Sequence, residues 1–144
     1  NLPTTMFRFF TVYGPWGRPD LALFKFVDAM LDGRPIDIYN HGEMYRDFTY
    51  VGDITEGLIK AAESTSGEVF NLGGGNRVTL NHALEILQDT MGRELAQTRT
   101  GIELGDVKDT WADTNKVQSE LDWHPRTSLK EGLRAEVDWL ISIS

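Results

Sequence analysis

The feature that most constrains the fold is an apolar segment at residues 6–13, which reads Met6-Phe7-Arg8-Phe9-Phe10-Thr11-Val12-Tyr13. Aromatic and β-branched residues dominate it, and Gly14-Pro15 follows it, so we predict a strand. Its nearly continuous apolarity is typical of a strand in a parallel sheet that is buried on both faces. Such a strand needs neighbouring strands and covering helices.

Short strands alternate with amphipathic helices through the rest of the chain. We predict strands at residues 36–39 and 68–72 and an extended segment at 48–51, and we leave 94–101 between strand and loop. The predicted helices begin at Asp20, at Asp53 in a capping box with Glu56, at Thr79, at Asp113 or Thr114, and at Ser128 in a capping box with Glu131. This alternation predicts the α/β class.

Two or three short strands are too few to complete a parallel sheet with both faces covered. The chain also begins almost at the first predicted strand, with only residues 1–5 ahead of it. We therefore expect residues 1–144 to be a single fragment of a larger domain. The strands at about residues 6–13 and 68–72 would belong to a sheet whose other strands lie upstream of residue 1.

Composition excludes several classes of protein and site. The 144 residues are 40% hydrophobic and 25% charged, and 14 basic minus 22 acidic residues give a net charge of −8. A field of that sign disfavours nucleic acid as a partner, and no apolar stretch is long enough to predict a membrane span. There is no cysteine, and the three histidines are far apart in sequence, so we predict no metal site. We expect a soluble cytoplasmic protein.

A glycine-rich turn, Gly73-Gly74-Gly75, follows the strand predicted at residues 68–72, where a dinucleotide-binding loop would lie. The match to that loop is poor, because Val78 stands where the third glycine would allow close packing of helix on strand. A plain strand-to-helix turn is therefore favoured over a pyrophosphate-binding loop.

Several polar residues have both a binding and a structural interpretation. Arg18 follows the first strand and could clamp a carboxylate or phosphate, or could simply be a solvated arginine. Arg46 could bind an anion or form a local ion pair. Thr11 could bond only to backbone, Tyr39 could stack on a base or cover the core, and Asp106 could accept from a ribose hydroxyl or shape a turn.

Taken together, four segments resemble the extended short-chain dehydrogenase/reductases that act on nucleotide sugars, the NAD-dependent epimerase/dehydratase family. The segments, with x for positions outside the pattern, are Arg8-Phe9-Phe10-Thr11-Val12-Tyr13-Gly14-Pro15-Trp16-Gly17-Arg18-Pro19-Asp20, Tyr39-Asn40-x-Gly42-x-Met44-x-Arg46-Asp47-Phe48-Thr49-Tyr50-Val51-x-Asp53-Ile54, Phe70-Asn71-Leu72-Gly73 and Gly105-Asp106-Val107-x-x-Thr110-x-Ala112-Asp113. Thr11 together with residues 16–20 is most similar to the UDP-glucuronate 4-epimerases of that family.

The resemblance implies the last parallel strands of a Rossmann-type fold plus a small mixed α/β substrate-binding lobe. It implies an enzyme that interconverts UDP-glucuronate and UDP-galacturonate, in which NAD takes a hydride from C4 of the sugar and returns it to the opposite face. A UDP-sugar decarboxylase, a 4,6-dehydratase and a non-catalytic nucleotide-sugar-binding module remain as alternatives.

The family's glycine-rich NAD loop and its Tyr-x-x-x-Lys pair lie in the amino-terminal part of such enzymes, and neither pattern occurs in this sequence. We therefore assign no catalytic residue. We expect this chain to be a carboxyl-terminal part that lacks the NAD-binding region, binds no NAD by itself and is inactive alone.

The resemblance also implies roles for individual residues. Thr11 and Arg18 would face the hexuronic acid, with Arg18 on its carboxylate. Tyr39 would pack on uracil, Arg46 would bind the diphosphate, and Asp106 would accept from the ribose. The remaining positions implied are Val78 for the substrate and Tyr13 and Pro15 for the nicotinamide; Glu103 stands where the family usually has arginine or glutamine.

Overall fold

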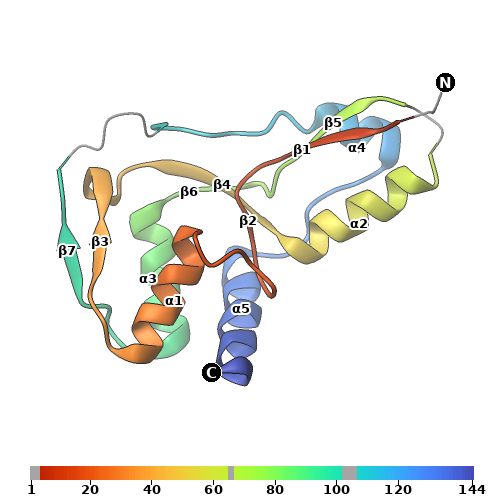
Figure 1. Cartoon of the computed structure of the whole chain (residues 1–144). Coiled ribbons are helices and arrows are strands. Elements are labelled where there is room, and N and C mark those ends of the chain that lie inside the picture. The colour runs from red at the N-terminus through yellow and green to blue at the C-terminus, as the bar shows by residue number, and fades with distance from the viewer. Residues whose placement is uncertain (1–3, 65–66, 102–106) are drawn as a thin grey trace.

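The computed structural model describes residues 4–64, 67–101 and 107–144 (Figure 1). The apolar segment at residues 6–13 forms two strands, so the prediction of one continuous strand is wrong. β1 (Met6–Phe9) pairs in parallel with β5 (Val69–Leu72), and β2 (Val12–Tyr13) pairs in parallel with β4 (Tyr45–Tyr50). The break falls at Thr11, whose φ of 23° lies in the left-handed region. The chain therefore leaves one sheet and enters another at this residue.

β4 is the middle strand of the second sheet, whose order is β2-β4-β6. β6 (Asn76–Thr79) runs antiparallel to β4 and follows the glycine-rich turn directly. The sequence predicted a helix immediately after that turn, and this strand was missed. A third small sheet pairs β3 (Ile36–Ile38) in parallel with β7 (Gln97–Arg99), which settles part of 94–101 as strand.

Five α-helices accompany the strands in the described part of the chain: α1 (Ala22–Asp32), α2 (Val51–Ala62), α3 (Leu80–Met91), α4 (Asn115–Leu121) and α5 (Leu129–Ile143). A short 3₁₀ turn, η1 (Tyr39–Gly42), follows β3. None of the described helices combines the length and apolarity that a membrane crossing requires. The alternation of strands and helices confirms the α/β class.

Of the five predicted helix caps, two are confirmed and two are wrong, and at the fifth Thr114 occupies the N-cap position of α4 without a side-chain cap hydrogen bond. The Thr79 side chain accepts from the backbone N–H of His82 at 3.2 Å, and Ser128 forms the capping box with Glu131. Asp20 and Asp53 do not cap, because the N-cap positions of α1 and α2 are Leu21 and Tyr50. Asp20 instead accepts from Arg18, and Asp53 accepts from Thr127 far along the chain. A distant donor displaced the local cap in the second case.

The buried side chains form two clusters. The larger one joins α1, α3 and α5 to β2, β3 and β4, with Val27, Phe48, Leu87 and Leu133 among its residues. The smaller one joins α2, α4 and β5, and its largest member is Trp123, whose indole N–H donates to the carbonyl of Asp53 at 2.8 Å. The smaller cluster lies under β1, on the right of Figure 1.

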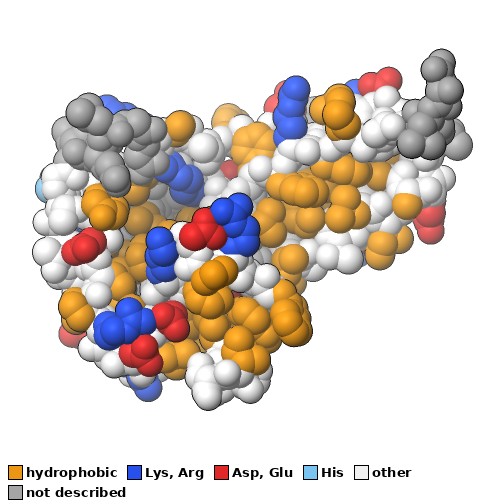
Figure 2. All heavy atoms as spheres, in the orientation of Figure 1, with side chains coloured by type: hydrophobic (Ala, Val, Ile, Leu, Met, Phe, Trp, Pro, Cys, Tyr) orange, Lys and Arg blue, Asp and Glu red, His pale blue; other side chains and the backbone are white. Residues whose placement is uncertain are grey.

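β1 is largely exposed, which corrects the expectation of burial on both faces. Met6 and Phe9 are each about half exposed, and Phe9 stacks on Phe7 with ring centroids 6.1 Å apart. On α2, Leu58 and Ile59 are exposed as well. Figure 2 shows hydrophobic side chains gathered over the region where Figure 1 places β1 and α2. β2 does meet the expectation in part, since Tyr13 is buried.

We expect this apolar face to make the chain self-associate and bind an apolar dye, because a contiguous exposed hydrophobic patch favours both. Replacing Phe9 with Lys should lower dye fluorescence and shift sedimentation toward the monomer. Ile143→Lys, an exposed apolar position at the end of α5, is the matched control. Equal effects of the two substitutions would contradict the assignment of the patch to β1.

Candidate functional site

The loop that follows β2 borders a small cavity of about 40 Å³. Three residues singled out in the sequence line it together: Thr11 at the break, Tyr13 in β2 and Arg18 in the loop. The cavity is also lined by Phe24 of α1, Phe48 of β4 and Glu136 of α5. The fold therefore gathers the residues that the resemblance assigned to the sugar and the nicotinamide end.

Tyr13 directs its side chain into the core. The residue is 3% exposed, its hydroxyl has no hydrogen-bond partner in the described structure, and a Cβ at Gly132 of α5 would overlap that hydroxyl. Burial, with the nearby Glu136 second, raises the pKa of Tyr13 above its ordinary value. Tyr13 is therefore a neutral phenol at physiological pH, and its side chain is packed in the core. Pro15, the other predicted nicotinamide contact, is half-buried in the loop.

Glu136 is a buried carboxyl group that the sequence analysis missed. Glu136 is 1% exposed, and its carboxyl group interacts with the backbone N–H of Gly14. Its Oε2 has no hydrogen-bond partner in the described structure. Burial raises its pKa to about 7. A signal for its burial was present, because positions 129, 133, 137 and 140 mark the apolar face of this helix and position 136 lies on the same face.

Arg18 holds a bidentate contact with Asp20. Its Nε donates to Oδ1 at 3.0 Å and its second terminal nitrogen donates to Oδ2 at 2.5 Å. The pair is exposed, with 74% of the Arg18 side chain accessible, so it adds little to stability. Its geometric effect is to fix the plane of the guanidinium at the mouth of the cavity. The contact lowers the pKa of Asp20.

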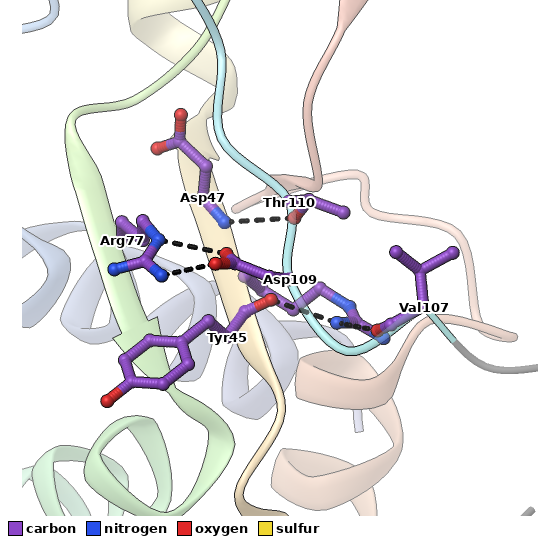
Figure 3. Close-up of polar contacts among 7 residues, drawn as sticks. Tyr45, Asp47, Arg77, Val107, Asp109 and Thr110 are labelled. Atoms are coloured by element: carbon purple, nitrogen blue, oxygen red, sulfur yellow. Dashed lines mark hydrogen bonds and ion pairs between the residues drawn. The ribbon is translucent and has the colours of Figure 1, made fainter.

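A second group of predicted residues lies farther along the same sheet. Arg46 of β4 stands directly opposite Val78 of β6 in the strand register. Its guanidinium donates to the carbonyl of Val107 at 2.6 Å and to that of Tyr45 at 2.9 Å (Figure 3). Tyr39 begins the neighbouring 3₁₀ turn and is 43% exposed. The next residue, Asn40, donates to the sulfur of Met44, which Arg46 also contacts.

Residues 107–110 lie along β4 and are fastened to it by several contacts. Tyr45 donates its N–H to the carbonyl of Lys108 at 2.9 Å and accepts from Thr110 N–H at 3.2 Å. Arg77 of β6 forms a two-pronged ion pair with Asp109 and places its guanidinium 4.3 Å from the centroid of the Tyr45 ring (Figure 3). Asp106, the predicted ribose contact, and Glu103 lie outside the described residues.

The predicted site residues thus fall into two groups on one sheet. Thr11, Tyr13 and Arg18 lie around the cavity, and Arg46 and Val78 lie on neighbouring strands at the other end of β4. β4 joins the groups, because Thr49 donates its N–H to the carbonyl of Thr11 at 3.1 Å. The described residues hold no cluster of three or more metal-ligating side chains.

Comparison with known proteins identifies the family. Residues 1–73, half of the chain, match the NAD dependent epimerase/dehydratase family. This chain belongs to that family. A UDP-glucuronate 4-epimerase from Thermodesulfobacterium geofontis is 40% identical over 140 residues, which cover 96% of this chain and 43% of that protein.

Solved structures of the family have the same fold. The UDP-glucuronic acid 4-epimerase from Bacillus cereus, solved with UDP-glucuronic acid and NAD, is 34% identical and superposes on 99% of this chain with a TM-score of 0.94. The UDP-glucose 4-epimerase from Thermotoga maritima is 32% identical, with a TM-score of 0.89. Each match covers 46% of the solved chain. The chain thus spans about half the length of its relatives, as a carboxyl-terminal part of a Rossmann-type epimerase would.

The glycine-rich turn of this family member does not offer a place for the pyrophosphate of NAD. A Cβ at Gly74 would overlap the carbonyl oxygen of Phe48, and one at Gly73 would overlap the side chain of Ala112. The buried carboxylate of Asp47 accepts from Ala112 N–H at 3.1 Å and interacts with the backbone of Gly74, Gly75 and Asn76. Burial nevertheless raises the pKa of Asp47. The turn is filled by the protein's own backbone and carboxylate, so these glycines serve packing.

Replacing Gly74 with Ala should therefore destabilise the fold by about 2–3 kcal/mol, since the added methyl meets backbone that cannot swing aside. Gly101→Ala is the matched control, because a Cβ there meets nothing within 4 Å. Urea unfolding of both variants measures the difference. A Gly74→Ala variant as stable as the control would refute this close approach of backbone to backbone.

Glu136 should make the stability of the chain depend on pH. Its folded pKa of about 7 lies above its ordinary value of 4.5, so its contribution is fully present below 4.5 and is lost as pH rises to about 7. The loss is about 3 kcal/mol, from 1.36 kcal/mol for each pKa unit. Glu136→Gln should remove this slope, measured by urea unfolding between pH 5 and 8. Asp138→Asn, exposed on the same helix, should keep it; parallel curves for wild type and Glu136→Gln would contradict the assignment.

Proposed function

We propose that this chain is the substrate-binding part of a nucleotide-sugar epimerase that interconverts UDP-glucuronate and UDP-galacturonate at C4. The observation that carries this proposal is that one arginine lies in the loop after β2 and a second lies in β4, the strand beside β2. Arg18 lies at the cavity beside β2, and Arg46 lies three residues along β4 from Thr49, which bonds to Thr11. Three residues of strand span roughly 10 Å. A site that extends in this way along β4 suits a ligand with a carboxylate at one end and a diphosphate at the other.

The charge of the chain supports this division of roles. With a net charge of −8, an anionic ligand must be held by individually placed cations. A guanidinium whose plane is fixed, as that of Arg18 is by Asp20, can hold a carboxylate through two parallel hydrogen bonds. Such a grip would restrain the carboxylate of a 4-keto sugar, which as a β-keto acid can otherwise leave as CO₂. Arg46, with Val78 opposite and Tyr39 nearby, would receive the nucleotide part.

We further propose that the whole enzyme has an NAD-binding region that packs on the exposed face of β1 and supplies the redox chemistry. The family match and the relatives support this, since the Bacillus cereus structure contains NAD and this chain matches about half of it. We expect Tyr13 and Pro15 to be this chain's contribution to the cofactor site and the rest of that site to come from the NAD-binding region, because the glycine-rich turn is filled and no Tyr-x-x-x-Lys occurs in the sequence. Thr11 and the loop after β2 would orient the sugar toward that region.

Calorimetric titration of the chain with UDP-glucuronate and with UDP distinguishes the proposed roles of Arg18 and Arg46. Arg46→Ala should weaken binding of both ligands by roughly 10- to 100-fold, the cost of a lost charge-assisted hydrogen bond. Arg18→Ala should weaken UDP-glucuronate by a similar factor and leave UDP unchanged. Arg34→Ala is the control, because that arginine pairs with Asp28 and Asp32 away from the sheet. An Arg18→Ala variant that binds both ligands like wild type would refute the carboxylate assignment.

The purified 144-residue chain should not convert UDP-glucuronate to UDP-galacturonate, with or without added NAD, because it carries no catalytic tyrosine–lysine pair. Chromatography of the reaction mixture measures the product. Turnover by the chain free of other polypeptides would overturn this expectation. A pentose product from the whole enzyme would identify a decarboxylase instead.

A further inference from the structure

Helix α5 contacts the end of β2 and the loop that follows it at three places. Gly132 lies against the hydroxyl of Tyr13, and Glu136 interacts with the N–H of Gly14. Trp139 packs against Trp16 with ring centroids 5.7 Å apart and ring planes tilted by 39°. Positions 132, 136 and 139 are spaced by four and three residues, so they lie on one face of the helix. This face of α5 therefore packs against the chain from Tyr13 to Trp16.

The middle contact is the only polar one of the three. Oε1 of Glu136 also lies 3.7 Å from where a Cβ of Gly17 would stand, so the carboxyl group is close to both ends of the turn. That turn is closed by a hydrogen bond from Gly17 N–H to the carbonyl of Gly14 at 3.1 Å. Arg18 follows immediately. The orientation of Arg18 therefore depends on a turn whose first amide is held from α5.

We propose that Glu136 is a positioning residue for the loop at residues 14–18, and that its carboxyl group, by holding the N–H of Gly14, sets the direction in which Arg18 is presented. This inference rests on the proposed function only for the role of the loop in binding the sugar. A buried acid is a costly way to fill a core position, and its orphaned Oε2 adds to that cost. An apolar side chain would fill the same space but would leave the Gly14 amide without its acceptor.

The surroundings of Glu136 make the contact sensitive to pH. Around the shared cavity the other polar ionisable groups are Tyr13 from β2 and Arg18 from the loop, while α1 and β4 contribute apolar residues. Arg18 is engaged with Asp20. Ionisation of Glu136, centred near pH 7, therefore leaves a buried charge that no described cation neutralises. Moving the loop to admit water to the carboxylate relieves that cost.

The pair of indoles reports on the loop without any ligand. Trp16 belongs to the loop and Trp139 to α5, with ring centroids 5.7 Å apart. At that separation we expect their transitions to couple and to give a circular-dichroism couplet that Trp16→Phe should remove. In the wild-type chain we expect this couplet to weaken as pH rises through about 7. Glu136→Gln retains an acceptor for Gly14 and cannot ionise, so its couplet should be present and independent of pH. Glu136→Met should lose the couplet while keeping the helical signal.

One control variant and two contrary outcomes make the test decisive. Asp138→Asn, exposed on the same helix, should behave as wild type. A titration near pH 7 that persists in Glu136→Gln would overturn the proposal, as would a couplet that survives in Glu136→Met. If Glu136→Met does not fold, the comparison of wild type with Glu136→Gln still decides. The couplet needs no ligand, so a failure of the Arg18 and Arg46 binding predictions would refute the proposed function and leave this result standing.

Discussion

Two hydrogen bonds from one buried threonine organise the structure. Thr49 of β4 donates its hydroxyl to the carbonyl of Phe10 at 2.6 Å and its N–H to the carbonyl of Thr11 at 3.1 Å. These bonds fix the point at which the chain leaves the β1–β5 pair and enters the β2-β4-β6 sheet. The side chain of Thr49 is fully buried, so water does not compete for these acceptors. Both hydrophobic clusters and the loop after β2 take their relative places from this junction.

The same junction explains why the residues after Thr11 are held by specific contacts, whereas β1, before Thr11, exposes apolar side chains. Beyond Thr11 the chain is held by β4 and α5, which place Gly14 and Trp16 by specific contacts. Before Thr11, β1 has one described strand neighbour, β5, and shows its aromatic side chains to solvent. An α/β sheet normally covers both of its faces. The exposed face of β1 is consistent with the proposed docking of an NAD-binding region. The loop after β2, held by β4 and α5, is consistent with the proposed binding of the sugar.

How far the sequence predicted the site follows from how local each contact is. The sequence placed Arg18 in the loop after the first strand, where the structure has it, but it predicted neither that Arg46 lies within a strand nor the partners of the two arginines. Asp20, predicted to cap a helix, instead accepts from Arg18. Arg46 donates to the carbonyl of Val107, which is 61 residues away in the sequence. Glu136 was missed because a glutamate on a helix is usually solvated. Its burial follows from the packing of α5 on the loop.

By itself the sequence determined the α/β class, the caps at Thr79 and Ser128, the helical spacing of α3 and α5, and membership of the epimerase family. These depend on neighbouring residues, on periodicity and on motifs, which a linear chain displays. Only the tertiary structure decided the break at Thr11, the strand after the glycine-rich turn, and the burial of Glu136. Each of these is set by hydrogen bonds or packing between segments far apart in sequence, where local preference is weaker than the requirement to satisfy buried polar groups.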